Sequence, residues 1–224
     1  MDSQKKKLIT GKQFSQTIKK EIRKTIQGDY LLYLPKDYSK TDKKWPMVLF
    51  LHGAGERGED LELVKNHGLP KLIEQGRSFP FIVLSPQCHE NQRWSIEFLN
   101  ALLNETFLKY EIDENRIYVT GLSMGGFSAW ELALKYPERF AAIAPVCGGA
   151  DPQKACLIKH LPVWAFHGAK DKIVPIDRAQ AMVDALRSLG GDVKFTVYPD
   201  AGHDSWTETY ENQELYDWLL RHHR

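Results

Sequence analysis

Short, continuously apolar runs alternate with longer amphipathic segments over most of this chain. The six runs are Met47–Leu51, Phe81–Leu84, Ile117–Thr120, Ala141–Val146, Val163–Phe166 and Phe195–Tyr198. A strand that is apolar on both faces is typical of a parallel sheet between helices, because both of its faces are covered. The pattern therefore predicts an α/β fold with a mostly parallel central sheet and helices on both faces.

The segments between these runs predict helices, and glycine or proline stands where several of them should end. The predicted helices are Gly68–Gln75, Ser95–Tyr110, Gly125–Tyr136, Ile176–Leu189 and Asn212–His222. Pro137 and the Gly190-Gly191 pair supply helix stops. Because no internal repeat or low-complexity linker interrupts the alternation, we predict a single domain over residues 1–224.

The first 34 residues follow a less regular pattern. Residues 1–13 are polar and basic, and we expect a flexible or peripheral N-terminal segment there. Ile18, Ile22 and Ile26 recur every four residues, a spacing that leaves a strand and a helix face both open. The segment 29–34 is a better strand, and Pro35 ends it.

Charge and hydropathy exclude several classes of function. The chain has 30 Lys and Arg against 29 Asp and Glu, and they are scattered, so we expect no nucleic-acid partner. No apolar run approaches the roughly 20 residues that cross a bilayer, and the N-terminus lacks the apolar core of a signal peptide. We therefore expect a soluble cytoplasmic protein with no membrane partner, or a secreted or periplasmic one if an export signal has been removed.

The cysteines and histidines do not form a metal motif. Cys88, Cys147 and Cys156 belong to no CxxC or Cys/His cluster, and no HExxH pattern is present. An odd number of cysteines does not favour a disulfide framework, although Cys147 and Cys156 could pair in an exported protein. We expect free thiols, no metal and no cofactor.

A Gly-x-Ser-x-Gly pentapeptide joins one predicted strand to the helix after it. Residues 116–130, RIYVTGLSMGGFSAW, predict an apolar strand, an abrupt turn centred on Ser123 and the start of a helix. A serine on such a turn has an exposed hydroxyl with the helix amides behind it. The pentapeptide arises by chance in roughly one chain in fifteen of this size, so Ser123 as a nucleophile needs support from the rest of the chain.

Polar, glycine-rich loops follow four of the predicted strands. In open α/β sheets the chemistry lies at these carboxyl ends of the strands. The loops contain, in chain order, HGAGERG from His52, GLSMGG from Gly121, HGAKD from His167 and PDAGH from Pro199. A nucleophile, an acid and a histidine thus occur in the order Ser123, Asp171 and His203, each just past a strand.

These motifs resemble those of the α/β-hydrolase superfamily, and in particular its compact serine esterases of the phospholipase/carboxylesterase and dienelactone-hydrolase-like type. The matching stretches are LHGAGERG at 51–58, GLSMGG at 121–126, FHGAKDKIVP at 166–175 and AGHDSW at 201–206. The likeness runs from about Tyr30 onward. Dienelactone hydrolases themselves use cysteine where this chain has Ser123, which argues against that activity. The resemblance implies an α/β-hydrolase fold and ester hydrolysis without a cofactor.

Three side chains have distinct roles in the catalysis that we expect. A serine hydroxyl is a poor nucleophile, so a neutral imidazole must accept its proton and return it to the leaving group; His203 is the candidate for Ser123. A buried carboxylate must fix the imidazole tautomer, and the family pattern implies Asp171. Asp151 is the alternative acid, since some hydrolases carry it one strand earlier, but its Ala-Asp-Pro setting is also typical of a turn or helix cap.

Backbone amides are expected to bind the oxyanion of the tetrahedral intermediate. The resemblance implies the amide of Met124, the residue after the nucleophile, and one from the loop after His52. For this second amide Ala54 is favoured and Gly55 is the alternative. The glycines of the loop let its backbone approach a substrate closely.

Charged and imidazole side chains beside these loops have simpler interpretations than catalysis. His52 and His167 each precede glycine at a strand end, and we expect loop-shaping hydrogen bonds from both. Glu56 and Arg57 could contact an acidic substrate, but an internal ion pair that pins the loop is favoured.

Trp94, Trp206 and Gln87 are candidates for the wall of the substrate cleft. Trp206 follows His203 by three residues, and Trp94 follows the loop that contains Gln87. Each tryptophan could stack on an aromatic or sugar ring or simply close an end of the sheet, and both interpretations stay open. Residues 147–162 are too few for the cap of many lipases, so we expect an open cleft and no sizeable cap domain.

Together these features predict a serine carboxylesterase that acts through an acyl-Ser123 intermediate. An open cleft suits short-chain, aryl or carbohydrate-attached (feruloyl or acetyl) esters, on small molecules or on polysaccharides. A lysophospholipase or acyl-protein thioesterase is the first alternative, a serine peptidase the second, and an inactive binding module on a hydrolase fold the third. The natural ester and the oligomeric state are not defined by the sequence.

Overall fold

In the part of the chain that the structure describes, seven strands form one sheet in the order β1-β3-β2-β4-β5-β6-β7. β1 is antiparallel to β3, and the other neighbours are parallel. The strands are β1 (Tyr30–Tyr33), β2 (Trp45–Leu51), β3 (Ile82–Pro86), β4 (Ile112–Leu122), β5 (Ala142–Val146), β6 (Val163–Gly168) and β7 (Val193–Tyr198). This is the mostly parallel sheet that the apolar runs predict.

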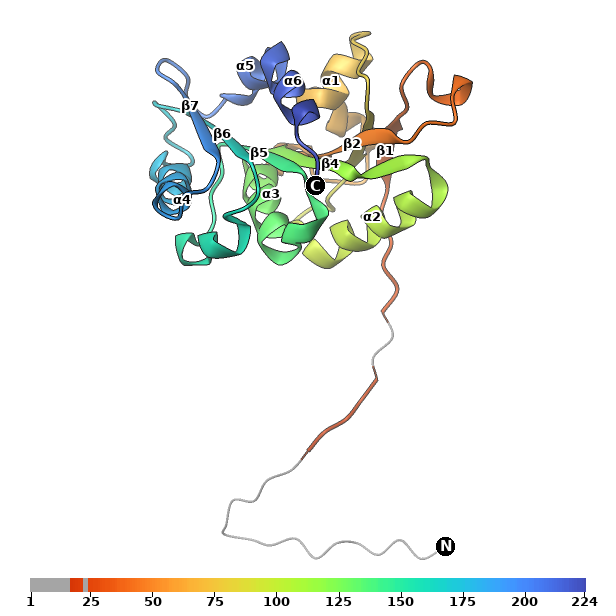
Figure 1. Ribbon diagram of the computed structural model, residues 1–224, viewed down its shortest axis with the longest axis horizontal. Coiled ribbons are helices and arrows are strands. Elements are labelled where there is room, and N and C mark those ends of the chain that lie inside the picture. Colours follow the sequence, from red (N-terminus) through yellow and green to blue (C-terminus); the bar gives the residue numbers. More distant parts are fainter. Residues whose placement is uncertain (1–16, 22–23) are drawn as a thin grey trace, which may run out of the picture.

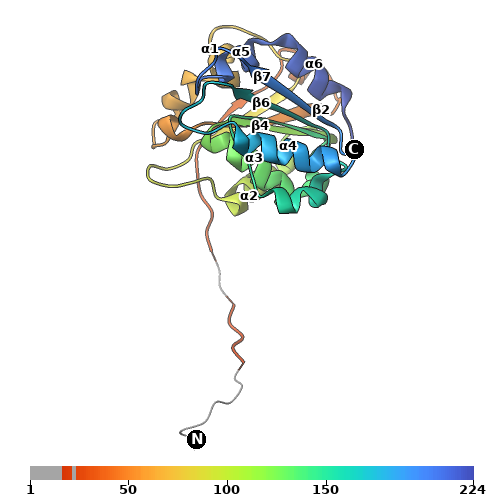
Figure 2. The same cartoon turned by 90° about the vertical axis from the view of Figure 1, so that its left-hand side faces the viewer.

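Helices cover both faces of the sheet in the computed structural model (Figures 1 and 2). On one face lie α1 (Gly68–Glu74), α5 (Trp206–Glu211) and α6 (Gln213–Arg221), and on the other lie α2 (Ile96–Lys109), α3 (Met124–Lys135) and α4 (Asp177–Ser188). Short 3-10 helices occupy several connections: η1 (Tyr38–Lys40), η2 (Ala54–Glu56), η3 (Leu61–Asn66), η4 (Pro137–Arg139) and η5 (Pro152–Ile158). The three-layer α/β-hydrolase arrangement is therefore confirmed.

The central strand β2 shows why the apolar runs are continuous. All seven of its residues are buried. Val48 and Phe50 pack into the core on the α1, α5 and α6 side, whereas Leu49 and Leu51 pack into the core on the α2, α3 and α4 side. Successive side chains of a strand point to opposite faces, so a strand between two helical layers needs apolar residues at every position.

Two elements differ from the prediction. β4 begins at Ile112 and not, as predicted, at Ile117. Residues 113–116 belong to the strand although they are polar and not buried. α5 was not expected, since residues 206–211 are mostly polar and only Thr209 and Tyr210 within them are buried.

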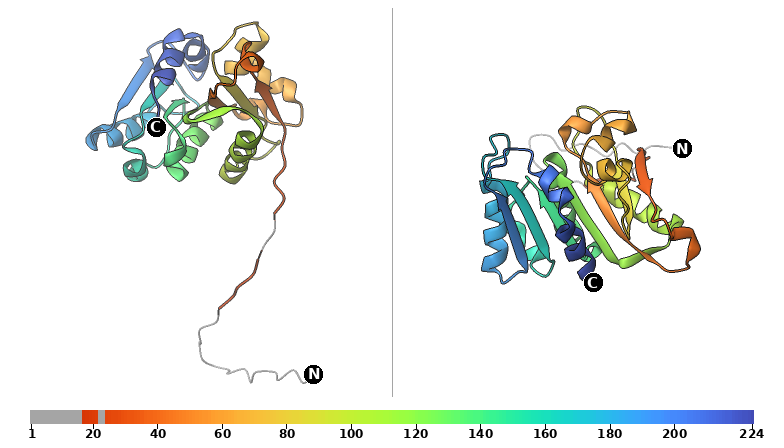
Figure 3. Two further views of the ribbon diagram at one scale, coloured as in Figure 1. Left: turned by 45° about the vertical axis from the view of Figure 1, so that its right-hand side comes forward. Right: turned by 90° about the horizontal axis from the view of Figure 1, so that it is seen from above.

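Seen from above, the C-terminal helix α6 lies over the middle of the sheet (Figure 3). The Tyr118 hydroxyl of β4 donates a hydrogen bond to the carbonyl of His222, just after this helix (2.8 Å).

The structure describes residues 17–21 and 24–224. The predicted N-terminal segment 1–13 and Ile22 lie outside the described residues. Residues 17–21 and 24–29 form neither helix nor strand, so the described part contradicts a regular element at Ile18 and Ile26. Ile18 is 88% exposed.

The strand order places the expected catalytic loops together. From β2 the chain passes to β3 on one side of β2 and then to β4 on the other side. The strand order therefore reverses its direction between β2 and β4, and the loops after these two strands lie at that point of the sheet. Leu51 and Gly121 are paired at the ends of these two strands. Clefts for ligands form at such points in open α/β sheets. Between β5 and β6 the described chain holds only η5, and no inserted cap.

In the described residues, no helix is both long enough and apolar enough to cross a bilayer.

Candidate active site

Ser123 lies on a strained turn between β4 and α3. Its φ of 51° and ψ of −114° are in a region that residues with a side chain rarely adopt. Its N–H donates to the carbonyl of Val146 (3.0 Å) and lies 3.2 Å from the sulfur of Cys147. A Cβ atom at Gly121 would come within 2.6 Å of the carbonyl oxygens of Leu51 and Gly125. The motif therefore needs glycine because neighbouring backbone passes so close.

The loops after β6 and β7 bring an acid and a histidine to this turn. The Nε2 atom of His203 lies 3.0 Å from the Oγ atom of Ser123, and its Nδ1 atom lies 2.7 Å from an oxygen of Asp171. A Cβ atom at Gly168 would collide with the carbonyls of Ala201 and Gly202. Glycine at this position thus permits the close contact of the two loops.

The Asp171 carboxylate is completely buried and well supplied with hydrogen bonds. Burial acts to raise its pKa, but the hydrogen bonds from His203 and from the backbone N–H groups of Val174 and Ile173 outweigh burial and lower the pKa. One oxygen accepts from Ile173 (2.8 Å) and Val174 (2.9 Å), and the other faces His203. A carboxylate only accepts hydrogen bonds, so the proton of His203 is on Nδ1. The lone pair of Nε2 then faces the Ser123 hydroxyl.

The Asp151 side chain does not reach His203. It is the N-cap of η5, and its side chain accepts a hydrogen bond from the backbone N–H of Gln153 (3.1 Å). The helix-cap interpretation accounts for it, and Asp171 alone of the two contacts His203.

His167 shapes the turn that carries Asp171. Its Nε2 atom lies 2.9 Å from the carbonyl of Val174 and 3.4 Å from an oxygen of Asp171. Because a carbonyl cannot donate, Nε2 carries the proton and donates to Val174. This is the loop-shaping role that the sequence predicts for His167.

His52 also binds backbone through both ring nitrogens. Its Nε2 atom accepts from the N–H of Cys88 (3.0 Å), so its Nδ1 atom carries the proton and donates to the carbonyl of Gly53 (2.6 Å). The ring is completely buried. Burial lowers the pKa of His52 to about 4, with a smaller contribution from the charge of Arg57. The neutral ring holds the exits of β2 and β3 together.

The candidate oxyanion amides lie at the exits of β2 and β4. Met124 begins α3, and the N–H groups of a first helical turn have no partner within the helix. In the facing loop, the N–H of Gly53 donates to the side chain of Glu56 (2.9 Å) and is not available to a substrate. Ala54 and Gly55 are exposed, and their amides remain the candidates for the second donor.

Contacts of Glu56 and Arg57 with other parts of the chain pin the loop, and the two side chains do not pair with each other. The Glu56 carboxylate is 8% exposed and lies 3.6 Å from Nε2 of His67. Arg57 donates instead to the carbonyls of Ala54 (2.9 Å) and Gln92 (3.2 Å). Among the described residues Glu56 and Arg57 form no salt bridge with each other, because their side chains point to different neighbours. His67 is the partner that the sequence analysis missed, eleven residues further along the chain.

The three candidates for the cleft wall occupy different environments. Trp94 is 5% exposed, packs its ring 4.7 Å from that of His52, and donates from Nε1 to the carbonyl of the same residue (3.2 Å). Gln87 donates to the carbonyls of Glu56 (3.1 Å) and Asp60 (2.7 Å). Both side chains therefore support the loop after β2, whereas Trp206 packs directly against His203, with ring centroids 5.2 Å apart.

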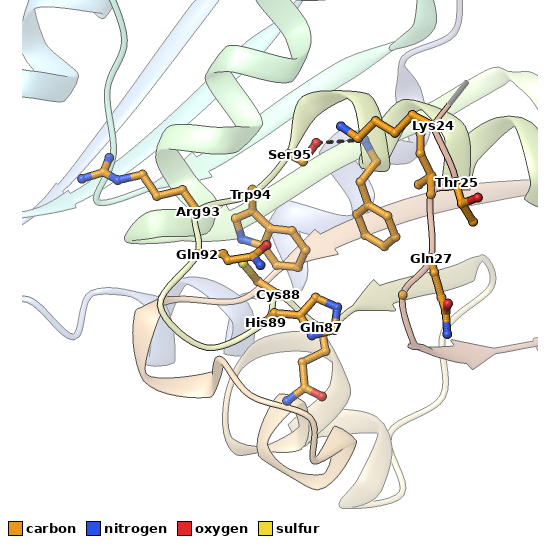
Figure 4. A pocket seen from close by; sticks show the side chains of 13 residues that line it. Lys24, Thr25, Gln27, Gln87, Cys88, His89, Gln92, Arg93, Trp94 and Ser95 are labelled. Atoms are coloured by element: carbon orange, nitrogen blue, oxygen red, sulfur yellow. Dashed lines mark hydrogen bonds between the residues drawn. The ribbon is translucent and has the colours of Figure 1, made fainter. Parts of the chain in front are cut away.

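Trp94 and Gln87 also line a pocket (Figure 4). The pocket has a volume of about 180 Å³ and lies between residues 24–28 and residues 87–98. Its lining does not include Ser123 or His203. In the described structure these two side chains thus line this pocket and support the loop after β2.

Three potential metal ligands meet beside Ser123. Single ligand atoms of Cys147, Asp171 and His203 lie within 4.8 Å of one another. The carboxylate and the imidazole already bind each other, and burial raises the pKa of the Cys147 thiol to about 12, so that the thiol is neutral. Hydrogen bonding accounts for this cluster. Cys156 is exposed, and neither cysteine forms a disulfide.

The sheet topology and the turn at Ser123 define the chain as an α/β-hydrolase. A family model described as Phospholipase/Carboxylesterase matches residues 37–219. The chain belongs to this family of hydrolases.

Individual relatives include esterases and a thioesterase. The chain is 29% identical to acyl-protein thioesterase 1 of Gibberella zeae over 75% of its own length and 88% of that protein. It is 26% identical to the carboxylesterase SOBER1 of Arabidopsis thaliana over 63% of its own length and 64% of that protein. The chain spans only 36% to 48% of the length of three other curated relatives.

Solved structures share the fold. A thermostable esterase matches with a TM-score of 0.75 and 39% identity, over 87% of this chain and 59% of that one. A ferulic acid esterase matches with a TM-score of 0.66 and 20% identity, over 86% of this chain and 91% of that one. At 20% identity the second likeness concerns the fold alone.

Proposed function

We propose that this protein is a serine carboxylesterase that hydrolyses its substrate through an acyl-Ser123 intermediate. The observation that carries the proposal is the continuous run of hydrogen bonds from Ser123 Oγ through His203 to the buried Asp171 carboxylate. Such an arrangement activates a serine, because the imidazole accepts the hydroxyl proton and the carboxylate stabilises the imidazolium that forms.

The reaction has two steps. Ser123 Oγ attacks the ester carbonyl while its proton passes to Nε2 of His203, and the amides of Met124 and of Ala54 or Gly55 bind the oxyanion. Collapse of the intermediate breaks the bond to the alcohol, which leaves with the proton from His203. Water then attacks the acyl-Ser123 ester in the same way, and the acid is released with Ser123 regenerated.

We propose that the cleft is open and takes short-chain, aryl or carbohydrate-attached acyl groups such as feruloyl or acetyl. Two observations support this. No cap is inserted between β5 and β6 in the described chain, and Trp206, beside His203, is partly exposed. Aromatic side chains at such positions stack on aryl and sugar rings.

An acyl-protein thioesterase or lysophospholipase is the second candidate. It is favoured by the relation to acyl-protein thioesterase 1 of Gibberella zeae, which extends over most of both chains. That function needs an apolar channel for a long acyl chain. A series of p-nitrophenyl esters from acetate to palmitate, compared with feruloyl and acetyl saccharides, separates the two: a maximum at long chains would favour the second candidate.

The serine mechanism is tested by Ser123→Ala with p-nitrophenyl acetate as substrate. We expect kcat to fall by about 10⁴-fold or more, as for other catalytic serines. Ser188→Ala is the matched control, because Ser188 is an exposed serine at the end of α4. Retention of full activity by Ser123→Ala would overturn the proposal.

A fluorophosphonate probe and a peptide substrate test the remaining alternatives. The probe should label wild-type protein at Ser123 and fail to label Ser123→Ala. A folded wild-type protein that takes up no label would favour an inactive binding module on the hydrolase fold. Efficient cleavage of a peptide amide would favour a peptidase.

A further inference from the structure

A run of side-chain contacts joins the loop after β2 to the ring of His203. Glu56 accepts the N–H of Gly53 with one oxygen (2.9 Å), and its other oxygen lies 3.6 Å from Nε2 of His67. The His67 ring packs against Trp206 with centroids 5.5 Å apart, and Trp206 packs against His203 with centroids 5.2 Å apart. The run thus links the candidate oxyanion loop to the candidate general base, and it passes outside the triad.

Trp206 lies between His67 and His203 in this run, and a compact turn holds it in place. It is the first residue of α5, and the N–H of Ser205 before it donates to the carbonyl of His203 (2.8 Å). The side chain of Asp204 accepts from the N–H and the hydroxyl of Thr207 (3.0 and 2.9 Å). This compact turn fixes the indole relative to His203, with the two ring planes 89° apart. Such an edge-to-face contact is a favourable geometry for aromatic rings.

His67 lies against Trp206 from another part of the chain. It follows η3 and directly precedes α1. The next residue, Gly68, has a φ of 62°, and the ring of Phe50 occupies the space that a Cβ atom would need. The chain therefore turns sharply at Gly68, and this turn brings His67 to both Glu56 and Trp206.

We infer that Trp206 is a positioning residue for His203, with His67 and Glu56 as its support; the inference rests on the proposed function. His203 is 20% exposed, and its two nitrogens are fixed by Asp171 and Ser123. Because both of these contacts are made by ring nitrogens, the imidazole can still tilt about the line that joins its two nitrogen atoms. The edge-to-face contact with Trp206 opposes that tilt, and the contact with His67 keeps Trp206 in place.

The first experiment compares Trp206→Ala and Trp206→Phe with ethyl acetate, which has no aromatic ring that could stack on Trp206. We expect Trp206→Ala to lower kcat by about 10- to 100-fold, as a misplaced catalytic group does, and to change KM by less than about threefold. Trp206→Phe keeps an aromatic edge, and we expect it to restore most of kcat.

Trp218 provides the matched control. Its ring packs against that of His222 at 4.6 Å with the planes 68° apart and against that of Trp164 at 5.6 Å. Trp218→Ala should therefore lower stability without lowering kcat of the folded protein. An equal loss of kcat in Trp206→Ala and Trp218→Ala would overturn the inference, since both would then act through folding alone.

The role of His67 is tested by a double-mutant cycle. If His67 acts through Trp206, His67→Ala should lower kcat less than Trp206→Ala, and the double variant should be no worse than Trp206→Ala. Additive losses would contradict the proposed chain of support.

A further measurement needs no substrate. The proton between Nδ1 of His203 and Asp171 gives a strongly downfield resonance in proton NMR, which reports how firmly the ring is held. We expect this resonance in wild type and Trp218→Ala and its broadening or loss in Trp206→Ala. An unchanged resonance in Trp206→Ala, or a rise in KM for feruloyl esters with kcat unchanged, would show that Trp206 is only a cleft wall. If wild type shows neither ester turnover nor fluorophosphonate labelling, the proposed function fails, whereas this resonance still tests the positioning of His203.

Discussion

Two histidines lie beside a tryptophan in loops at the carboxyl ends of the strands, and their ring nitrogens are used differently. His52, beside Trp94, binds the backbone of Gly53 and Cys88 and is completely buried. His203, beside Trp206, faces a serine hydroxyl and a carboxylate and is 20% exposed. The first ring is held neutral, whereas the second can exchange a proton with a hydroxyl.

The difference shows that the partners of a histidine define its role better than its neighbours in sequence. Both residues follow an apolar strand and occur in glycine-containing loops. Backbone groups at both nitrogens fix one tautomer and leave no acceptor for a substrate proton. A buried carboxylate at one nitrogen alone leaves the other nitrogen free to act as a base.

Replacement of His203 should give the largest effect and the sharpest test of this contrast. We expect His203→Ala to lower kcat by about 10⁴-fold or more while the protein stays folded. His52→Gln should lower kcat by less than about 100-fold, because a displaced loop weakens at most one oxyanion donor. Hydrolysis of p-nitrophenyl acetate at matched folded concentration measures both. Equal losses of kcat in His203→Ala and His52→Gln would contradict the proposed difference between the two histidines.

The carboxylate that distinguishes the two histidines gives the next effect. Asp171→Asn should lower kcat by about 10⁴-fold, because the amide can donate and so favours the wrong tautomer of His203. Asp151→Asn is the matched control, since asparagine also caps a helix, and its kcat should stay within a few-fold of wild type. A large loss in the control variant instead would assign the acid to Asp151.

The buried histidine should control stability at mildly acidic pH. The pKa of His52 is about 4 in the folded protein, against an ordinary value of 6.5, so the unfolded chain takes up its proton first as the pH falls. The contribution of neutral His52 to the free energy of unfolding is complete above pH 6.5. As the pH falls from 6.5 to about 4, this free energy decreases by about 3 kcal/mol. Urea unfolding at several pH values measures this loss, and His52→Gln should show a weaker pH dependence than wild type over the same range.

The smallest effect should come from the tryptophan beside His52. Trp94→Phe removes the hydrogen bond from Nε1 to the carbonyl of His52 (3.2 Å) and should lower the free energy of unfolding by about 1 kcal/mol. Because Trp94 does not contact His203, kcat should change less than in Trp206→Ala. A loss of kcat as large as that of Trp206→Ala would make the two tryptophans equivalent.

The fold was predictable because its signal repeats along the chain. Each strand from β2 to β7 includes one of the predicted runs. Burial on both faces demands apolar residues throughout β2, β3, β5 and β6, whereas in the edge strand β7 only Tyr198 is buried. The polar start of β4 and the short α5 were missed, because neither carries a continuous apolar stretch. The order of Ser123, Asp171 and His203 at successive strand ends likewise came from local motifs.

The contacts between distant loops could not be predicted in this way. Glu56 lies against His67 and not against the adjacent Arg57, and Trp94 supports a loop whereas Trp206 packs against His203. The same residue types in similar local sequences thus have different partners. Only the packing of η3, α1 and α5 around the ends of the strands decides which partner each side chain meets.

The sequence by itself determined the α/β architecture and the residues with the right chemistry at the right strand ends, because hydrophobic periodicity and turn motifs act over a few residues. The tertiary structure decided which histidine faces the serine, which acid reaches that histidine and which tryptophan lies against it. Those choices depend on loops that are far apart in the chain and meet within a few ångströms, where burial and hydrogen bonding select a single partner for each polar atom.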